Sequence, residues 1–300
     1  MTTPTSPLLT LNNGVQMPAL GLGVFQSTRE QTAGAVETAI GAGYRLIDTA
    51  AAYANEAQVG EGIRRSGIDR AELFVTTKLW MSDHGHDATL RAFDASLRRL
   101  GLDYLDLYLV HWPVPADWER TLDSWRAMEK LLADGRVRAI GVCNHHPHHL
   151  EDLVRATDVV PAVNQVELHP FFNQPRVRAA NAKLGVVTQS WSPIGGGRVY
   201  NAGTPDAPHS PLEHPTITGL AQAYGKTPAQ VVIRWHLQHG LSVIPKSVRP
   251  ERITENIDVF DFELTVADMA AIDALTTGVR AGADPEVVDQ QLFGVTIDND

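Results

Sequence analysis

A polar or aromatic residue stands where each of seven apolar runs of this sequence stops. Their types include a carboxylate, an ammonium group, an imidazole and two amides, which can exchange protons with a ligand or hold it by hydrogen bonds. They are Asp48, Lys78, His111, Asn144, Gln165, Trp191 and Lys246. If the ends of the seven runs meet in the fold, these side chains surround one cavity and carry its chemistry.

Histidines form two further groups that would suit a metal site: His84 with His86, and His145, His146, His148 and His149 around Pro147. Metal sites use histidines at comparable spacings, so a metal-dependent hydrolase is an alternative to consider. However, the first pair lies in a loop, and the second group resembles the solvated first turn of a helix. Among the residues that end the apolar runs, Asp48 is the only carboxylate near either group. We therefore expect no metal in the site.

Glycine-rich segments could approach phosphate groups, but one of them fails as a dinucleotide motif. Gly21-Leu22-Gly23 lacks the third glycine and the helix start of the Rossmann fingerprint. Gly195-Gly196-Gly197 follows an apolar run and could bring backbone amides close to a phosphate, or it could be a plain loop. The segment from Ile194 to Pro215 is long and irregular, which is typical of a lid.

The elements that must position these residues alternate along the chain. After a hairpin at Leu8–Met17 we expect eight strands, each followed by a segment with apolar residues at helical spacing. The expected strands are Leu20–Phe25, Arg45–Thr49, Leu73–Trp80, Leu105–Trp112, Val137–Asn144, Ala162–Leu168, Val186–Ser192 and Leu241–Ser247. Strands separated by helices pair in parallel. A closed (β/α)₈ TIM barrel would bring all strand ends to one face, whereas the rival open sheet would spread them along an edge.

Composition limits the setting in which the protein works. A chain of 300 residues suits one barrel domain over residues 1–300. The net charge of −10 argues against nucleic acid or an anionic membrane surface as partner. We find no apolar stretch of membrane-spanning length. The Thr- and Pro-rich start, Met1–Thr10, is not typical of a signal peptide, and we expect it to be a mature N-terminus. The single cysteine, Cys143, favours a reducing compartment, so we expect a cytoplasmic protein.

Three long segments resemble, in order, the three signatures of the aldo-keto reductase family. They are Gly43–Ala50 continuing to Tyr53 and Glu56, Gly135–Asn144, and Ile244–Arg252 continuing to Asn256. Within the family, the chain is most similar to bacterial 2,5-diketo-D-gluconic acid reductases. That likeness depends on Pro161–Gln165, Lys226–Gln230 and Asp258–Phe262.

The resemblance implies a catalytic tetrad of Asp48, Tyr53, Lys78 and His111. Reduction of a carbonyl leaves negative charge on its oxygen, which needs a proton or hydrogen-bond donors. Tyr53 would be the general acid, and we expect Lys78 to lower its pKa while Asp48 holds the lysine. His111 would orient the carbonyl oxygen. Each residue alone has an ordinary structural explanation, but the four together fit the family pattern.

The resemblance also implies NADPH as cofactor. Asn144 and Gln165 match the positions that hold the carboxamide, and Trp191 matches the position that stacks on the nicotinamide. Many members have serine in place of Cys143 and tyrosine in place of Trp191. Lys246, Ser247, Arg249 and Arg252 would bind the 2′-phosphate, since arginine suits phosphate oxygens, and Asn256 lies near the adenine position.

Phe25, Trp80 and Trp112 end three expected strands and would wall a substrate pocket. Aromatic walls with few polar groups hold small carbonyl compounds by shape. We therefore expect a broad reductase of small aldehydes, α-dicarbonyls and keto acids, including diketo sugar acids, that works as a monomer. We expect bulky ketones to be poor substrates, because the tail after Thr277 is short and polar. The alternative from another functional class is a non-catalytic protein that senses a nucleotide and acts as the partner of another protein.

Overall fold

Eight parallel strands form the centre of the computed structural model, which describes residues 6–195 and 210–299. The sheet order is β10-β9-β8-β7-β6-β5-β4-β3. The strands are β3 Leu22–Gly23, β4 Leu46–Asp48, β5 Phe74–Leu79, β6 Leu105–Val110, β7 Val137–Cys143, β8 Val163–Glu167, β9 Val187–Trp191 and β10 Ser242–Val243. Parallel bridges join Leu20 to Val243 and Gly23 to Lys246, so the first and last strands meet. The predicted (β/α)₈ fold is confirmed.

The central strands are buried on both faces, although they include polar residues such as Thr76 and Lys78 in β5. Every residue of β5 and of β6 is buried. The first and last strands are shorter than the sequence predicted, only two residues each, because isolated bridges replace a continuous ladder at the closure. The predicted hairpin forms from β1 (Leu8–Thr10) and β2 (Gln16–Pro18). Its Leu11 and Met17 pack with Leu46, Phe74 and Leu107.

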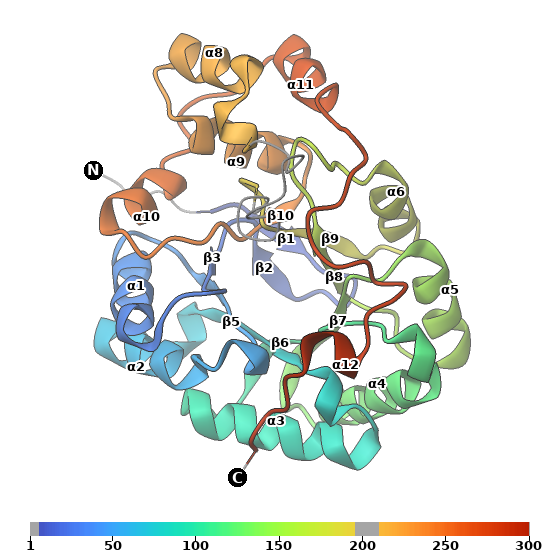
Figure 1. Cartoon of the computed structure of the whole chain (residues 1–300). Helices are drawn as coiled ribbons and strands as arrows, with labels where there is room; N and C mark the ends of the chain where they lie inside the picture. The colour runs from blue at the N-terminus through green and yellow to red at the C-terminus, as the bar shows by residue number, and fades with distance from the viewer. Residues whose placement is uncertain (1–5, 196–209, 300) are drawn as a thin grey trace.

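Helices surround the sheet, as Figure 1 shows. They are α1 Arg29–Gly41, α2 Glu56–Ser66, α3 His86–Leu100, α4 Trp118–Ala133, α5 Pro147–Ala156, α6 Pro175–Lys183, α8 Pro215–Tyr224, α9 Pro228–Gln238, α10 Pro250–Ile257, α11 Val266–Asp273 and α12 Gln290–Phe293. Short 3₁₀ helices are η1 Ala51–Tyr53, η2 Arg70–Glu72, η3 Met81–Asp83, η4 Pro115–Asp117 and η5 Pro211–Glu213. Within the described ranges, no helix combines the length and the apolar character needed to cross a membrane.

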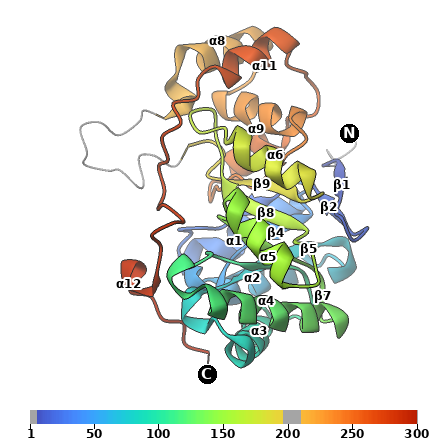
Figure 2. The same ribbon diagram turned by 90° about the vertical axis from the view of Figure 1, so that its right-hand side faces the viewer.

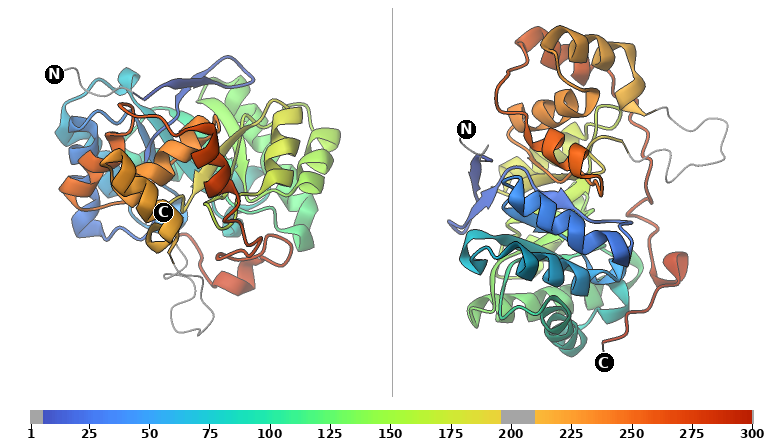
Figure 3. Two further views of the ribbon diagram at one scale, coloured as in Figure 1. Left: turned by 90° about the horizontal axis from the view of Figure 1, so that it is seen from above. Right: turned by 90° about the vertical axis from the view of Figure 1, so that its left-hand side faces the viewer.

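The two ends of the barrel carry different parts of the chain. In Figures 2 and 3 the β1–β2 hairpin lies at one end, and the C-terminal segment after α11 runs across the opposite end. The strand ends that carry the predicted site residues face this second end. Most of the predicted lid, Ile194–Pro215, lies outside the described residues.

Candidate active site

A cavity of about 660 Å³ opens at the carboxyl ends of the strands. It brings together ten residues singled out in the sequence: Phe25, Asp48, Tyr53, Trp80, His111, Trp112, Asn144, Gln165, Trp191 and Lys246. Each strand of the barrel contributes at least one of them, from its last residues or from the loop that follows it. This convergence is a consequence of closing the sheet, because parallel strands then end on a common rim.

Lys78 lies beneath the cavity floor and is fully buried. Its Nζ donates to Asp48 Oδ1 at 2.5 Å and to the Thr49 carbonyl at 2.8 Å, and it lies 3.4 Å from Tyr53 Oη. Burial is the largest effect on the pKa of Lys78 and would lower it, but Asp48, Tyr53 and Cys143 together outweigh burial, and the pKa is raised. The ammonium therefore stays charged beside the tyrosine hydroxyl.

Tyr53 ends η1, directly before Ala54, which adopts a left-handed backbone conformation. Its ring centroid lies 5.0 Å from that of Phe25 and 5.7 Å from that of His111. Lys78 acts on Tyr53 in the expected direction, because its charge and its hydrogen bond lower the pKa of the hydroxyl, but burial acts against it. Burial disfavours the tyrosinate more than Lys78 favours it, so the pKa of Tyr53 is raised. At neutral pH the side chain is a phenol that still carries its proton.

His111 follows β6 and is almost completely buried. Its ring stacks on Trp112 with centroids 6.4 Å apart and contacts Trp80 edge-on at 5.1 Å. Burial, followed by the nearby Lys78 charge, lowers the pKa of His111 well below its usual value. The imidazole is therefore neutral at pH 7 and has one N–H to donate. Its Nδ1 is buried and, among the described residues, has no hydrogen-bond partner.

Asn144, Gln165 and Trp191 form a connected polar wall. Asn144 follows β7 with φ at 59°, a left-handed conformation that asparagine tolerates. Its Nδ2 donates to the His111 carbonyl at 3.0 Å, and its Oδ1 accepts from Trp191 Nε1 at 2.9 Å. Gln165 Nε2 donates to Asp48 Oδ2 and to Gln189 Oε1, both at 2.7 Å. The Gln165 amide oxygen remains to accept a hydrogen bond from a ligand.

The predicted phosphate-binding residues lie beyond the cavity, around the start of α10. Lys246 reaches the cavity wall, whereas Ser247, Arg249, Arg252 and Asn256 do not line it. Arg249 and Arg252 are exposed, Ser247 and Asn256 are buried. No ion pair with a described carboxylate involves Lys246, Arg249 or Arg252. Three cations near one helix start are thus available to an anionic ligand.

The C-terminal segment supplies a wall that the sequence analysis missed. Ala281, Gly282, Ala283, Phe293 and Val295 line the cavity. The Phe293 ring lies 5.5 Å from Trp80 and 5.7 Å from Trp112, and Trp80 Nε1 donates to the Val295 carbonyl at 2.8 Å. The tail therefore adds apolar surface, contrary to the expectation of a polar tail. No local pattern could reveal contacts between residues some 200 positions apart.

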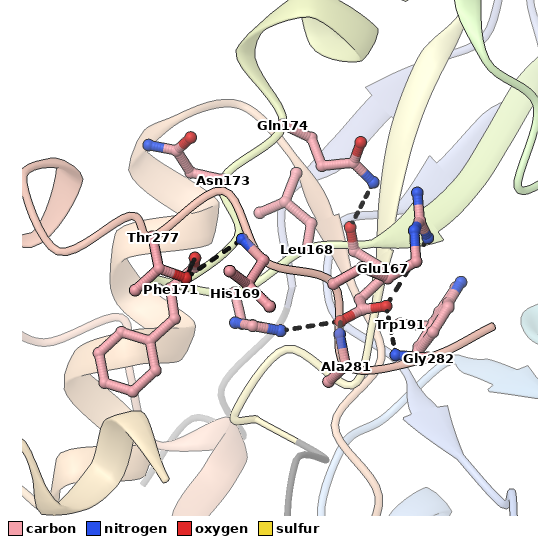
Figure 4. A network of polar contacts seen from close by, with 12 residues as sticks. Glu167, Leu168, His169, Phe171, Asn173, Gln174, Trp191, Thr277, Ala281 and Gly282 are labelled. Carbon is pink, nitrogen blue, oxygen red and sulfur yellow. Dashed lines mark hydrogen bonds and ion pairs between the residues drawn. The ribbon is translucent and has the colours of Figure 1, made fainter. Parts of the chain in front are cut away.

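Glu167, the last residue of β8, fixes this wall (Figure 4). Its carboxylate is fully buried and accepts from the Ala281 N–H at 2.7 Å and the Gly282 N–H at 2.9 Å. His169 Nε2 lies 3.1 Å from the same carboxylate. A side chain on Gly282 would come within 2.6 Å of Trp191 Cη2. The close packing of the tail against Trp191 thus depends on this glycine and on the Glu167 anchor.

The two groups of histidines that the sequence analysis considered as metal ligands do not line the cavity. The interpretation of His145–His149 as a solvated helix turn is wrong in part, because His145 and His149 are buried. Nor do the histidines lack a carboxylate: Glu286, from the C-terminal segment, lies 2.5 Å from His146 Nδ1. His84 is also buried, and its Nδ1 contacts Thr121 Oγ1 at 3.3 Å.

Comparison with known proteins places this arrangement in a family. The family model described as "Aldo/keto reductase family" matches residues 19–277. Morphine 6-dehydrogenase of Pseudomonas putida is 60% identical over 96% of this chain and 97% of its own length. Glyoxal reductase of Bacillus subtilis is 46% identical over 98% of this chain and 100% of its own length.

Solved structures agree with this result. The crystal structure of a Bombyx mori aldo-keto reductase in complex with NADP superposes with a TM-score of 0.86 at 36% identity. The match covers 94% of this chain and 96% of that chain. The family model covers most of the chain and the relatives align almost end to end, so the chain belongs to the aldo/keto reductase family of oxidoreductases.

Proposed function

We propose that this chain is an NADPH-dependent carbonyl reductase with Tyr53 as its proton donor. The observation that carries the proposal is the buried contact of Tyr53 Oη with the Lys78–Asp48 ion pair at the floor of an aromatic cavity. The raised pKa of Tyr53 means that its hydroxyl is protonated when a carbonyl arrives. As charge builds on the carbonyl oxygen, Lys78 stabilises the tyrosinate left behind.

His111 has a separate role in this proposal. Because its imidazole is neutral at pH 7, it can donate one hydrogen bond to the carbonyl oxygen without competing for the proton of Tyr53. Its stacking on Trp112 and edge contact with Trp80 fix the ring. The substrate oxygen would therefore meet two donors, Tyr53 and His111, from neighbouring positions on the rim.

The wall residues fit a nicotinamide cofactor, which when bound would supply the reducing equivalent. Gln165 offers its amide oxygen to a carboxamide, and Trp191 presents an indole face to a flat ring. Lys246, Arg249 and Arg252 are cations without a described carboxylate partner, as a 2′-phosphate site requires. The NADP-bound Bombyx mori relative supports the same assignment.

The substrates that we propose are small aldehydes, α-dicarbonyls and keto acids. The support is the aromatic cavity with few polar groups and the likeness to a protein named glyoxal reductase. The sequence resemblance to 2,5-diketo-D-gluconic acid reductases adds diketo sugar acids to this class. We also propose that the protein works as a monomer.

A second candidate is the interconversion of polycyclic alcohols and ketones. The observation that favours it is the tail wall, since Phe293 extends the aromatic surface of Trp80 and Trp112. The relative that shares 60% identity is named morphine 6-dehydrogenase. This candidate uses the same donors and cofactor wall and differs only in the size of the occupant.

A substrate panel separates the two candidates. We expect NADPH absorbance to fall with glyoxal-type dicarbonyls, aromatic aldehydes and keto acids, with a higher kcat/KM than for polycyclic ketones. A polycyclic ketone with NADPH, or a polycyclic alcohol with NADP⁺, whose kcat/KM exceeds that of every small carbonyl would favour the second candidate. No turnover with any of them, despite NADPH binding, would instead support the nucleotide-sensing alternative.

A further inference from the structure

Three histidines at the start of α5 surround one carboxylate from the C-terminal segment. His146 precedes α5 as its N-cap residue, and His148 and His149 lie in its first turn. Glu286 belongs to the segment between α11 and α12, so 140 positions separate it from His146. None of these four residues lines the active-site cavity. The group is therefore separate from the catalytic residues described above.

The nitrogen and oxygen atoms that could bind a metal ion lie close together in this group. Glu286 Oε1 lies 2.5 Å from His146 Nδ1 and 3.4 Å from His148 Nε2. The ligand atoms of His146, His148 and Glu286 all lie within 4.8 Å of one another. A zinc ion with bonds of about 2.0–2.2 Å to nitrogen and oxygen fits among atoms at such separations, with a small outward shift of Glu286. His148 and Glu286 are exposed, so an ion has a path of entry.

We propose that His146, His148 and Glu286 form a binding site for a divalent transition-metal ion, of which Zn²⁺ fits best, and that the ion fastens the C-terminal segment to α5. Imidazole nitrogens and a carboxylate suit Zn²⁺, whereas Mg²⁺ and Ca²⁺ prefer all-oxygen sites. Water completes the coordination on the exposed side. The site is structural and does not depend on the proposed reductase activity.

His149 provides a second observation that points to this carboxylate. Its side chain is buried, and its Nε2, without a hydrogen-bond partner among the described residues, lies 3.7 Å from Glu286 Oε2. Its Nδ1 accepts from the His146 backbone N–H at 3.2 Å, so in the neutral ring the proton is on Nε2. A short approach of Glu286 would let Oε2 accept this proton while Oε1 binds the ion. Such a contact orients a metal-binding carboxylate from outside the coordination sphere.

The protons can be accounted for. In the metal-free arrangement, Arg280 Nη2 donates to His146 Nε2 at 3.2 Å, so the His146 proton is on Nδ1 and faces Glu286. Binding of the ion at Nδ1 places this proton on Nε2, which must displace the Arg280 guanidinium. Arg280 Nη1 is buried without a hydrogen bond and lies 3.7 Å from Glu167 Oε2. The displaced guanidinium can therefore close its contact with Glu167.

The test is direct titration of the full chain, without any added histidine tag and after chelator treatment, with ZnCl₂. Competition against a chromophoric zinc indicator measures affinity and stoichiometry. Variants are His148→Ala and Glu286→Gln, both at exposed positions that a folded protein tolerates. The matched control is His86→Ala, because His86 also pairs with a carboxylate, Asp87 at 2.9 Å, but belongs to no such three-ligand group in the described chain.

We expect one zinc ion per chain, with affinity reduced at least about 10-fold in His148→Ala and in Glu286→Gln and unchanged in His86→Ala. Amide exchange around residues 284–289 should slow when Zn²⁺ is added to the parent and not when it is added to Glu286→Gln. Absence of saturable zinc binding by the parent would overturn the proposal. So would equal zinc affinity of the parent and both site variants, or exchange in the segment that Zn²⁺ leaves unchanged.

Discussion

Trp191 and Asn144 are joined by a hydrogen bond of 2.9 Å from the indole Nε1 to the amide Oδ1. The bond links the side chain proposed to stack on the nicotinamide with one proposed to bind its carboxamide. Many family members are expected to have tyrosine at the Trp191 position, so the indole N–H is a feature of this chain. It holds the two cofactor contacts in one fixed relation.

Replacing Trp191 by phenylalanine keeps a ring but removes this bond. Losing one hydrogen bond costs a net free energy of about 0.5–1.5 kcal/mol. We therefore expect NADPH to bind roughly 2- to 12-fold more weakly. Quenching of protein fluorescence or calorimetry measures it. Trp112→Phe, at a wall position not assigned to the cofactor, is the control and should bind NADPH as the parent does. Unchanged affinity in Trp191→Phe would mean that the bond does not organise the cofactor wall.

Tyr53→Phe removes the proposed proton donor and leaves the ring contact with Phe25 possible. We expect turnover to fall roughly 10²–10⁴-fold, the usual scale of general acid catalysis, with NADPH affinity nearly unchanged. Single-turnover kinetics with a reactive aldehyde checks this. The control Tyr104→Phe changes a tyrosine that lies against Arg70, away from the cavity. Turnover of Tyr53→Phe within about threefold of the parent would exclude Tyr53 as the acid.

Arg252→Ala tests the phosphate site. Loss of a charge-assisted hydrogen bond costs about 1.5–3 kcal/mol, or roughly 10- to 150-fold in affinity. NADPH binding should weaken by that factor and NADH binding should hardly change, because NADH lacks the 2′-phosphate. Arg126→Ala removes an exposed arginine paired with Asp123 on α4 and serves as the control for net charge. Equal losses for both cofactors would contradict the assignment.

Glu167→Gln tests the anchor of the tail wall. An amide offers one good acceptor where the carboxylate accepts from two backbone N–H groups, and each lost bond to a charged group costs about 1.5–3 kcal/mol. We expect a higher KM for carbonyl substrates, a smaller change in kcat, and faster proteolysis of the tail. Glu129→Gln is a matched control, since Glu129 also accepts two backbone N–H groups, from Asp158 and Val159, away from the cavity. A KM equal to that of the parent would show that the wall does not need Glu167.

The buried histidines make stability depend on pH. Burial lowers the pKa of His84 to about 3 and that of His236 to about 4, from 6.5. The unfolded chain therefore binds more protons below pH 6.5, so the stability from each histidine is complete above that pH and is lost as pH falls toward the folded pKa. At pH 5 the contribution of each histidine to the free energy of unfolding has fallen by about 2 kcal/mol.

Urea denaturation at pH 7.5 and pH 5 measures this loss. His84→Gln should reduce the difference in unfolding free energy between the two pH values by about 2 kcal/mol. His86→Gln, which removes an imidazole whose side chain is 45% exposed, is the comparison variant for the loss of a histidine without the loss of a buried group. A parent protein equally stable at both pH values would show that these histidines are not held neutral in the fold.

The sequence by itself determined the barrel and much of the rim of the candidate active site. Alternating β-rich and helical runs require parallel pairing, and closing the sheet then brings Asp48, His111, Asn144 and Trp191 to one face. These inferences succeeded because they depend on local periodicity and on a rule of topology. The family signatures added Tyr53, which no strand end indicated.

The tertiary structure alone decided what depends on contacts between distant parts of the chain. The sequence suggested that Lys78 would lower the pKa of Tyr53, but the burial that raises it is a property of the packed site. It left His146 and His148 without a carboxylate, although the folded tail brings Glu286 to them. It also missed Phe293 and the Glu167 anchor. Desolvation and long-range contacts arise only when the chain is folded, so no local pattern of residues encodes them.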